Sequence, residues 1–71
     1  MKTTDVACFV GKGGHRFAQI YTIEEDNNSF IVDYFDDDKY MGSLFYPTQN
    51  QAESSAENFA FRGLFDGNTN V

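Results

Sequence analysis

Apolar and polar side chains alternate along the first part of the chain in a way that divides it into four strands. Runs rich in aromatic and β-branched residues cover about residues 5–10, 15–24, 29–35 and 39–46. Such runs, bounded by short polar segments, are typical of β-strands. The segments between them contain glycine, asparagine or aspartate, which tight turns favour. The pattern therefore predicts a four-stranded antiparallel β-meander.

A helical pattern follows the last strand. Pro47 ends that strand, and Thr48 with Gln51 has the spacing of a capping box, in which two side chains bind free amide groups of the first helical turn. Small or apolar residues then recur at helical spacing: Ala52, Ala56, Phe59, Ala60 and Gly63. We therefore expect one domain, 1–71, of the α+β class, with a helix over about 49–62 and a loose tail over 66–71.

If the residues that flank each turn pair with one another, without a bulge or shift, the strand residues are sorted onto two faces of the sheet. We call this arrangement direct pairing. The face that makes the better core comprises Val6, Cys8, Val10, Phe17, Tyr21, Ile23, Phe30, Val32, Tyr34, Met41 and Phe45, with Gln19 and Ser43. The opposite face is mixed, with Ala7, Phe9, Ala18, Ile20, Ile31, Phe35, Tyr40, Leu44 and Tyr46 beside Arg16, Thr22, Glu24 and Asp33. One helix can cover only one face, so we expect the mixed face to stay open as a contact surface.

The charge balance narrows the choice of partner. The chain has 11 acidic residues against 5 basic ones and a formal net charge of −6. This field disfavours direct binding to nucleic acid or to an anionic membrane and favours a basic protein partner. The core of a 71-residue chain supplies only roughly 3 to 5 kcal/mol of folding stability. We therefore expect further burial of apolar surface against a partner or a second copy.

The compartment is predicted from the cysteine and from the apolar runs. Cys8 is the single cysteine, and a lone thiol suggests a reducing environment. No apolar run approaches the length of about 20 residues that a membrane span needs, and the first residues lack the apolar stretch of a secretion signal. These features predict a cytoplasmic protein.

Two groups of residues have the composition of a catalytic or anion-binding site. The loop 11–16, with three glycines, Lys12, His15 and Arg16, could present amides and cations to a phosphate. It lacks the spacing and the following helix of a P-loop, which favours a plain hairpin turn. Cys8 and His15 would lie diagonally on one hairpin if Val10 faces His15 and Cys8 faces Phe17. Because a cysteine in an apolar run is usually a core residue, we expect no enzyme activity and no cofactor.

Acidic turns and aromatic residues suggest two further sites. The carboxylates of residues 36–38, or those of residues 24–26, could coordinate a hard cation. Their spacing does not fit an EF-hand loop, which favours solvated turns and no metal site. Phe9, Phe35 and Tyr40 could stack nucleic-acid bases, but stacking platforms lie in positive grooves, and the flanking charge here is negative.

The hypothesis that remains is a small inhibitor or adaptor that engages a basic, nucleic-acid-handling protein. Its carboxylates would cover a broad surface as phosphates cover a duplex, which is nucleic-acid mimicry, and aromatic anchors would supply lasting affinity. The residues expected to contact the partner are Glu24, Glu25, Asp26, Asp33, Phe35, Asp36, Asp37, Asp38 and Tyr40. In the alternative, the charge only keeps the chain soluble, and the open face forms a homodimer.

No motif identifies a family. A β-meander followed by a Thr-capped, alanine-rich helix resembles small accessory domains of bacteria and phages, and small acidic phage inhibitors share this general character. The resemblance is one of architecture, and it implies a protein-binding role without naming a site.

Overall fold

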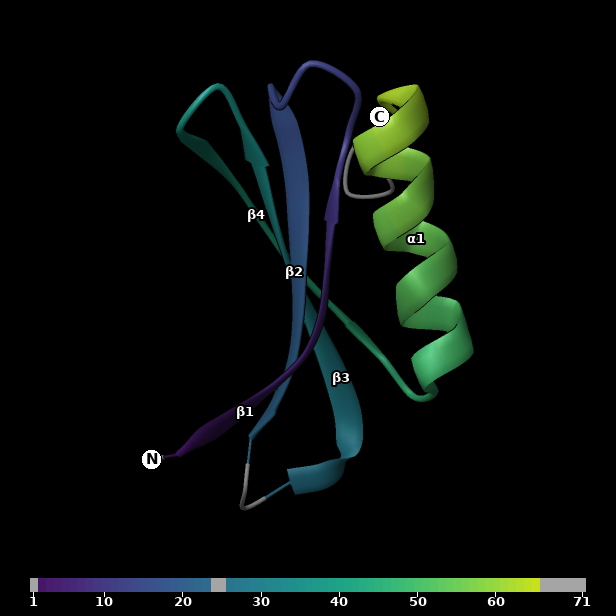
Figure 1. Ribbon diagram of the computed structural model, residues 1–71. Helices are drawn as coiled ribbons and strands as arrows, with labels where there is room; N and C mark the ends of the chain where they lie inside the picture. Colours follow the sequence, from purple (N-terminus) through teal and green to yellow (C-terminus); the bar gives the residue numbers. More distant parts are fainter. Residues whose placement is uncertain (1, 24–25, 66–71) are drawn as a thin grey trace.

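Four antiparallel strands form one sheet, and one helix packs on it, so the chain has the predicted α+β meander (Figure 1). The computed structural model describes residues 2–23 and 26–65. The elements are β1 (Thr3–Val10), β2 (Arg16–Ile23), β3 (Asp26–Asp36), β4 (Lys39–Tyr46) and α1 (Gln49–Arg62), and the sheet order is β1-β2-β3-β4. β1 and β3 begin earlier than the pattern indicated, and the tail over 66–71 lies outside the described residues.

Both predicted ends of α1 are present. The Thr48 hydroxyl accepts a hydrogen bond from the Gln51 amide at 3.2 Å, which satisfies one of the free donors of the first turn. Gly63 ends the helix with φ 75°, in the left-handed region, and its amide donates to the Phe59 carbonyl at 2.9 Å. Local sequence therefore determines where the helix begins and ends.

The registers of the three hairpins differ from the expectation of direct pairing. In the first hairpin Val10 pairs with Phe17 and Cys8 with Gln19, so the expected Val10–His15 and Cys8–Phe17 pairs were wrong by two positions. In the second hairpin, Phe17 pairs with Phe35. In the third, Phe35 pairs with Tyr40 but Tyr34 pairs with Gly42, which leaves Met41 as a bulge.

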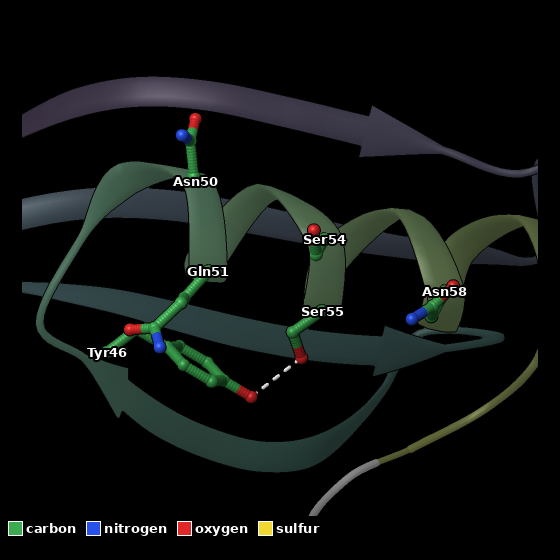
Figure 2. A pocket seen from close by; sticks show the side chains of 6 residues that line it. All are labelled: Tyr46, Asn50, Gln51, Ser54, Ser55 and Asn58. Atoms are coloured by element: carbon green, nitrogen blue, oxygen red, sulfur yellow. Dashed lines mark hydrogen bonds between the residues drawn. The ribbon is translucent and has the colours of Figure 1, made fainter.

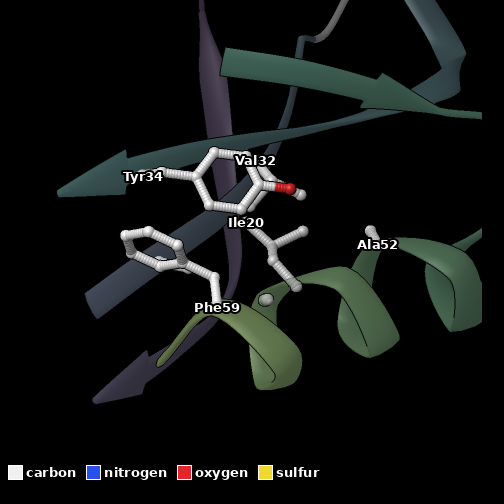
Figure 3. Packing of buried hydrophobic residues seen from close by; sticks show 7 residues of the cluster. Ile20, Val32, Tyr34, Ala52 and Phe59 are labelled. Carbon is white, nitrogen blue, oxygen red and sulfur yellow. The ribbon is translucent and has the colours of Figure 1, made fainter. Parts of the chain in front are cut away.

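The register of the second hairpin and the bulge at Met41 exchange the two faces of β2, of β1 after Val6 and of β4 after Met41, whereas Val6 and Met41 pack against the core as predicted. The predicted core positions of β3 are correct, but β1 and β2 contribute the residues that were placed on the mixed face. The resulting buried cluster consists of Ala18, Ile20, Val32, Tyr34, Ala52, Ala56 and Phe59 (Figure 3). Tyr34 and Phe59 form its centre, with ring centroids 5.1 Å apart in an edge-to-face arrangement.

Small residues let α1 approach this face of the sheet closely. Ala52, Ala56 and Ala60 are fully buried on the helix, and Ala18 is fully buried beneath them. At the C-terminal end of α1, the backbone of Gly11 lies directly against Ala60, where a Cβ atom on the glycine would be 2.0 Å from the Ala60 carbonyl oxygen. The end of the helix is therefore fixed beside the β1–β2 loop (Figure 1).

Candidate functional site

The sheet face opposite α1 carries an apolar surface that no described segment covers. We call it the open face, and by strand register its members include Cys8, Val10, Phe17, Gln19, Tyr21, Ile23, Asp33, Phe35, Tyr40, Ser43 and Phe45. The register also places Ile31 on this face, but its side chain is only 3% exposed. Val10, Tyr40 and Phe45 are 54%, 56% and 65% exposed. An exposed apolar patch of several strands is typical of a contact surface.

Three aromatic rings form a row across this face near the β3–β4 turn. Phe17 on β2 stacks on Phe35 on β3, with centroids 4.6 Å apart and planes 10° from parallel. Phe35 also contacts Tyr40 on β4 at 5.6 Å and 53°. Because each ring is held by its neighbour, this aromatic row is a preformed surface that loses little side-chain entropy on binding.

Polar groups converge on the carboxylate of Asp33 in the middle of the same face. Tyr21 donates its hydroxyl hydrogen to Asp33 Oδ1 at 3.4 Å, and the Ser43 hydroxyl donates to the same oxygen. The Tyr40 hydroxyl lies 2.5 Å from Ser43 Oγ. Since serine has one hydroxyl hydrogen and gives it to Asp33, Tyr40 must be the donor in that pair. We call these four residues the Asp33 cluster.

Within the described chain, no basic side chain pairs with Asp33. The positions of the basic residues explain why: Lys2 precedes β1, Lys12 is in the β1–β2 loop, Arg16 binds the helix, Lys39 is the first residue of β4 beside the turn, and Arg62 is in the last turn of α1. Arg16 Nε donates to the Phe59 carbonyl at 3.1 Å, on the opposite face of the sheet. The open face therefore combines apolar surface with a carboxylate that its own chain does not neutralise.

The Asp33 cluster gives a testable pH dependence. Burial raises the pKa of Tyr21 above its ordinary value of 10.0, and the charge of Asp33, its hydrogen bond and then Tyr40 raise it further. The native state thus holds this proton more tightly than the unfolded chain does. The contribution to stability is complete below pH 10.0 and is lost as the pH rises through the folded pKa. Urea denaturation should therefore show a steeper loss of stability above pH 10.0 for the wild type than for Tyr21→Phe. Equal slopes would contradict this assignment.

The predicted contact residues fall into three groups. Asp33, Phe35 and Tyr40 lie together on the open face. Asp37 and Asp38 form the β3–β4 turn with positive φ angles of 53° and 69°, whereas Asp36 alternates to the helix-bearing face. Glu24 and Glu25 lie outside the described residues, and Asp26 is the first residue of β3.

The turn residues are held by the neighbouring loop. His15 Nδ1 lies 2.7 Å from Asp37 Oδ1, and the Asp37 amide donates to the His15 carbonyl at 2.7 Å. Both side chains are well exposed, so this pair adds little to stability. Cys8 is exposed and pairs with Gln19 inside the sheet, with no described hydrogen bond to His15.

Sequence reasoning missed four members of the open face that matter for its chemistry: Gln19, Tyr21, Ser43 and Phe45. All four had been assigned to the core face, because the bulge at Met41 and the register of the second hairpin are not visible in the alternation. The available signal was Asp33 itself. A carboxylate in the middle of an otherwise apolar strand predicts that the sheet face on which it lies stays uncovered. The residues that pair with it on the neighbouring strands must then lie on the same face.

A shallow pocket of about 320 Å³ lies on the other side of the sheet, between α1 and β4. Its lining is polar and uncharged: Tyr46, Asn50, Gln51, Ser54, Ser55 and Asn58 (Figure 2). The Tyr46 hydroxyl donates to Ser55 Oγ at 2.7 Å, and Tyr34 lies 2.5 Å from the same oxygen. This hydrogen-bond network joins the helix to the sheet. Some of the side chains that line the pocket therefore also hold the fold together.

The remaining features add no second site. Among the described residues, no three His, Cys, Asp or Glu side chains gather as metal ligands would. In the same part of the chain, no helix has both the length and the apolar character that a membrane crossing requires. Comparisons of the chain with protein-family models, with curated proteins and with solved structures found no match.

Proposed function

We propose that this protein is a non-enzymatic binding module that engages a basic protein surface through the open face, as an inhibitor or an adaptor. One observation carries the proposal: the Asp33 carboxylate lies in the middle of an exposed aromatic surface, and no described basic side chain pairs with it. A partner that supplies both apolar contact and a cation would complement this surface. The net charge of −6 would also speed the encounter with a basic protein.

Proteins that handle nucleic acids present basic surfaces of this kind. Carboxylates on and beside the open face would take the place of phosphates, from Asp5 on β1, Asp33 on β3, and Asp37 and Asp38 in the β3–β4 turn. The exposed rings of Tyr40 and Phe45 would occupy apolar pockets of the partner. Mimicry of a nucleic acid is therefore part of the proposal.

Self-association through the open face is the second candidate, because the face is apolar and exposed. A face-to-face dimer would bring two Asp33 carboxylates into one interface between two chains that each carry a net charge of −6. Burial of a charge without an opposite partner costs several kcal/mol. This cost is why we favour a basic partner over a second copy.

Affinity capture with matched variants tests the proposal. Wild type, Phe45→Ser and Phe61→Ser would be immobilised and exposed to lysate of the natural host, with elution by a salt gradient. Phe45 and Phe61 are 65% and 55% exposed, but Phe45 is on the open face and Phe61 is on α1. We expect a basic protein that is held by wild type and by Phe61→Ser and lost about 30-fold with Phe45→Ser, as loss of an aromatic anchor worth about 2 kcal/mol implies.

Two results would contradict the proposal. One is the capture of the same proteins, at the same salt, by all three chains. The other is a wild-type protein that light scattering shows to be a stable dimer, with Phe45→Ser monomeric. That second outcome would assign the open face to self-association.

A further inference from the structure

We propose that the Asp33 cluster is a receptor for an arginine side chain of the partner. The inference rests on the proposed function and makes it specific, since it names the group that the open face recognises. Asp33 Oδ1 already accepts hydrogen bonds from Tyr21 and Ser43. A carboxylate has acceptor positions on both oxygens, so Oδ2 remains for a donor from outside.

The existing hydrogen bonds hold the carboxylate in a fixed position. Tyr40 donates to Ser43, Ser43 donates to Asp33, and Tyr21 donates to Asp33 from the neighbouring strand. Every hydroxyl of the cluster thus points its hydrogen toward the negative charge. A carboxylate fixed on a central strand binds a planar donor with less loss of entropy than a mobile surface carboxylate does.

The adjacent strand, β2, supplies a further hydrogen-bond acceptor. Gln19 pairs with Asp33 in the β2–β3 register, and its Nε2 donates to the carbonyls of Ala7 and Ile20, both at 3.2 Å. The amide nitrogen is thereby directed to the backbone, and the amide oxygen of Gln19 is left as a second acceptor on the strand next to Asp33. A guanidinium group has five N–H donors and can bind several acceptors at once.

Aromatic rings on two sides of Asp33 favour arginine over lysine. Phe35 is two residues along β3, about 7 Å away by strand geometry, and Phe45 is a diagonal neighbour on β4. A guanidinium plane stacks on aromatic rings while its edge binds a carboxylate. An ammonium group is smaller and more strongly hydrated, and it uses only part of this arrangement.

Peptide titration tests the inference. A short peptide of alternating glycine and arginine, and its lysine counterpart of equal length and charge, would be titrated at low salt into wild type, Asp33→Asn and Glu57→Gln. Both substitutions remove one negative charge, but Glu57 is exposed on α1, away from the open face. We expect wild type and Glu57→Gln to prefer the arginine peptide by about tenfold, and Asp33→Asn to lose this preference.

Phe45→Ser is the second variant, and it tests the same site without changing a charge. Because Phe45 is 65% exposed, its loss leaves the core intact, and the arginine preference should fall about threefold. Equal affinity of both peptides for wild type, or an equal effect of Asp33→Asn and Glu57→Gln, would show that the Asp33 cluster is not an arginine receptor. The proposal that the open face binds a basic partner would be unaffected by that result. Failure of both peptides to bind would instead overturn the proposed function.

Discussion

Gly11→Ala should destabilise the fold by about 3 kcal/mol, enough to remove most of the stability expected of a single small core. A Cβ atom at this position would lie 2.0 Å from the Ala60 carbonyl oxygen, 3.0 Å from the Ala60 carbonyl carbon and 3.5 Å from the Arg16 carbonyl oxygen. All three atoms belong to the backbone, so no side-chain rotation relieves the contact. The end of α1 must move away from the β1–β2 loop.

Such a movement would also break polar contacts that fix the helix. Arg16 Nε donates to the Phe59 carbonyl at 3.1 Å, and the Gly11 amide donates to the Arg16 carbonyl at 2.9 Å. The first bond joins the start of β2 to the helix, and the second closes the β1–β2 loop at the point of the clash. Loss of close helix packing together with these bonds explains the large effect expected from one methyl group.

Gly14→Ala is the matched control in the same loop. A Cβ atom at Gly14 meets no atom within 4 Å, so the substitution creates no clash. Its effect on stability comes only from placing alanine in a left-handed backbone conformation, with φ 75°, which destabilises the fold by about 1 kcal/mol. Urea denaturation followed by circular dichroism would measure both variants. If Gly11→Ala were as stable as Gly14→Ala, the close approach of the loop and helix would be wrong.

Phe59→Ala should have the second large effect, a loss of about 3 to 5 kcal/mol. Phe59 is 2% exposed and lies at the centre of the buried cluster. Its ring packs edge-to-face on Tyr34 at 5.1 Å and on Phe65 at 5.8 Å. The remaining core is made largely of alanine on the helix side, and alanine side chains cannot move to fill the cavity. We expect a chain that is mostly unfolded at 25 °C.

Phe61→Ala provides the comparison on the same helix. Phe61 is 55% exposed, and its one described ring contact is edge-to-face with Phe9 at 6.3 Å. Its loss should cost no more than about 1 kcal/mol. Thermal unfolding of the two variants would separate them clearly, and similar midpoints would show that α1 does not bury the face that contains Phe59.

Much of the fold could be predicted because its signals are local. Thr48, Gln51 and Gly63 define the helix through bonds to neighbouring backbone groups, and polar turns separate the strands. The registers between strands could not be predicted in this way. A bulge such as the one at Met41 adds one residue to a strand and moves every later side chain to the other face.

The candidate site also combines features that local sequence predicts with features that depend on the strand registers. The grouping of Asp33, Phe35 and Tyr40 on one face was predicted and follows from their positions beside the β3–β4 turn, where Phe35 pairs with Tyr40. Phe45 was expected in the core and is 65% exposed, because it follows the bulge. Tyr21 and Ser43 join Asp33 only through the observed registers of the second and third hairpins.

The amino-acid sequence by itself determined the number and order of the strands, the ends of the helix and the excess of negative charge. The tertiary structure decided which face α1 covers. The helix presents small residues and packs where Ala18 and Gly11 allow close approach. The face with Asp33 stays open, because burial of its carboxylate beneath an alanine-rich helix without a cation would cost several kcal/mol.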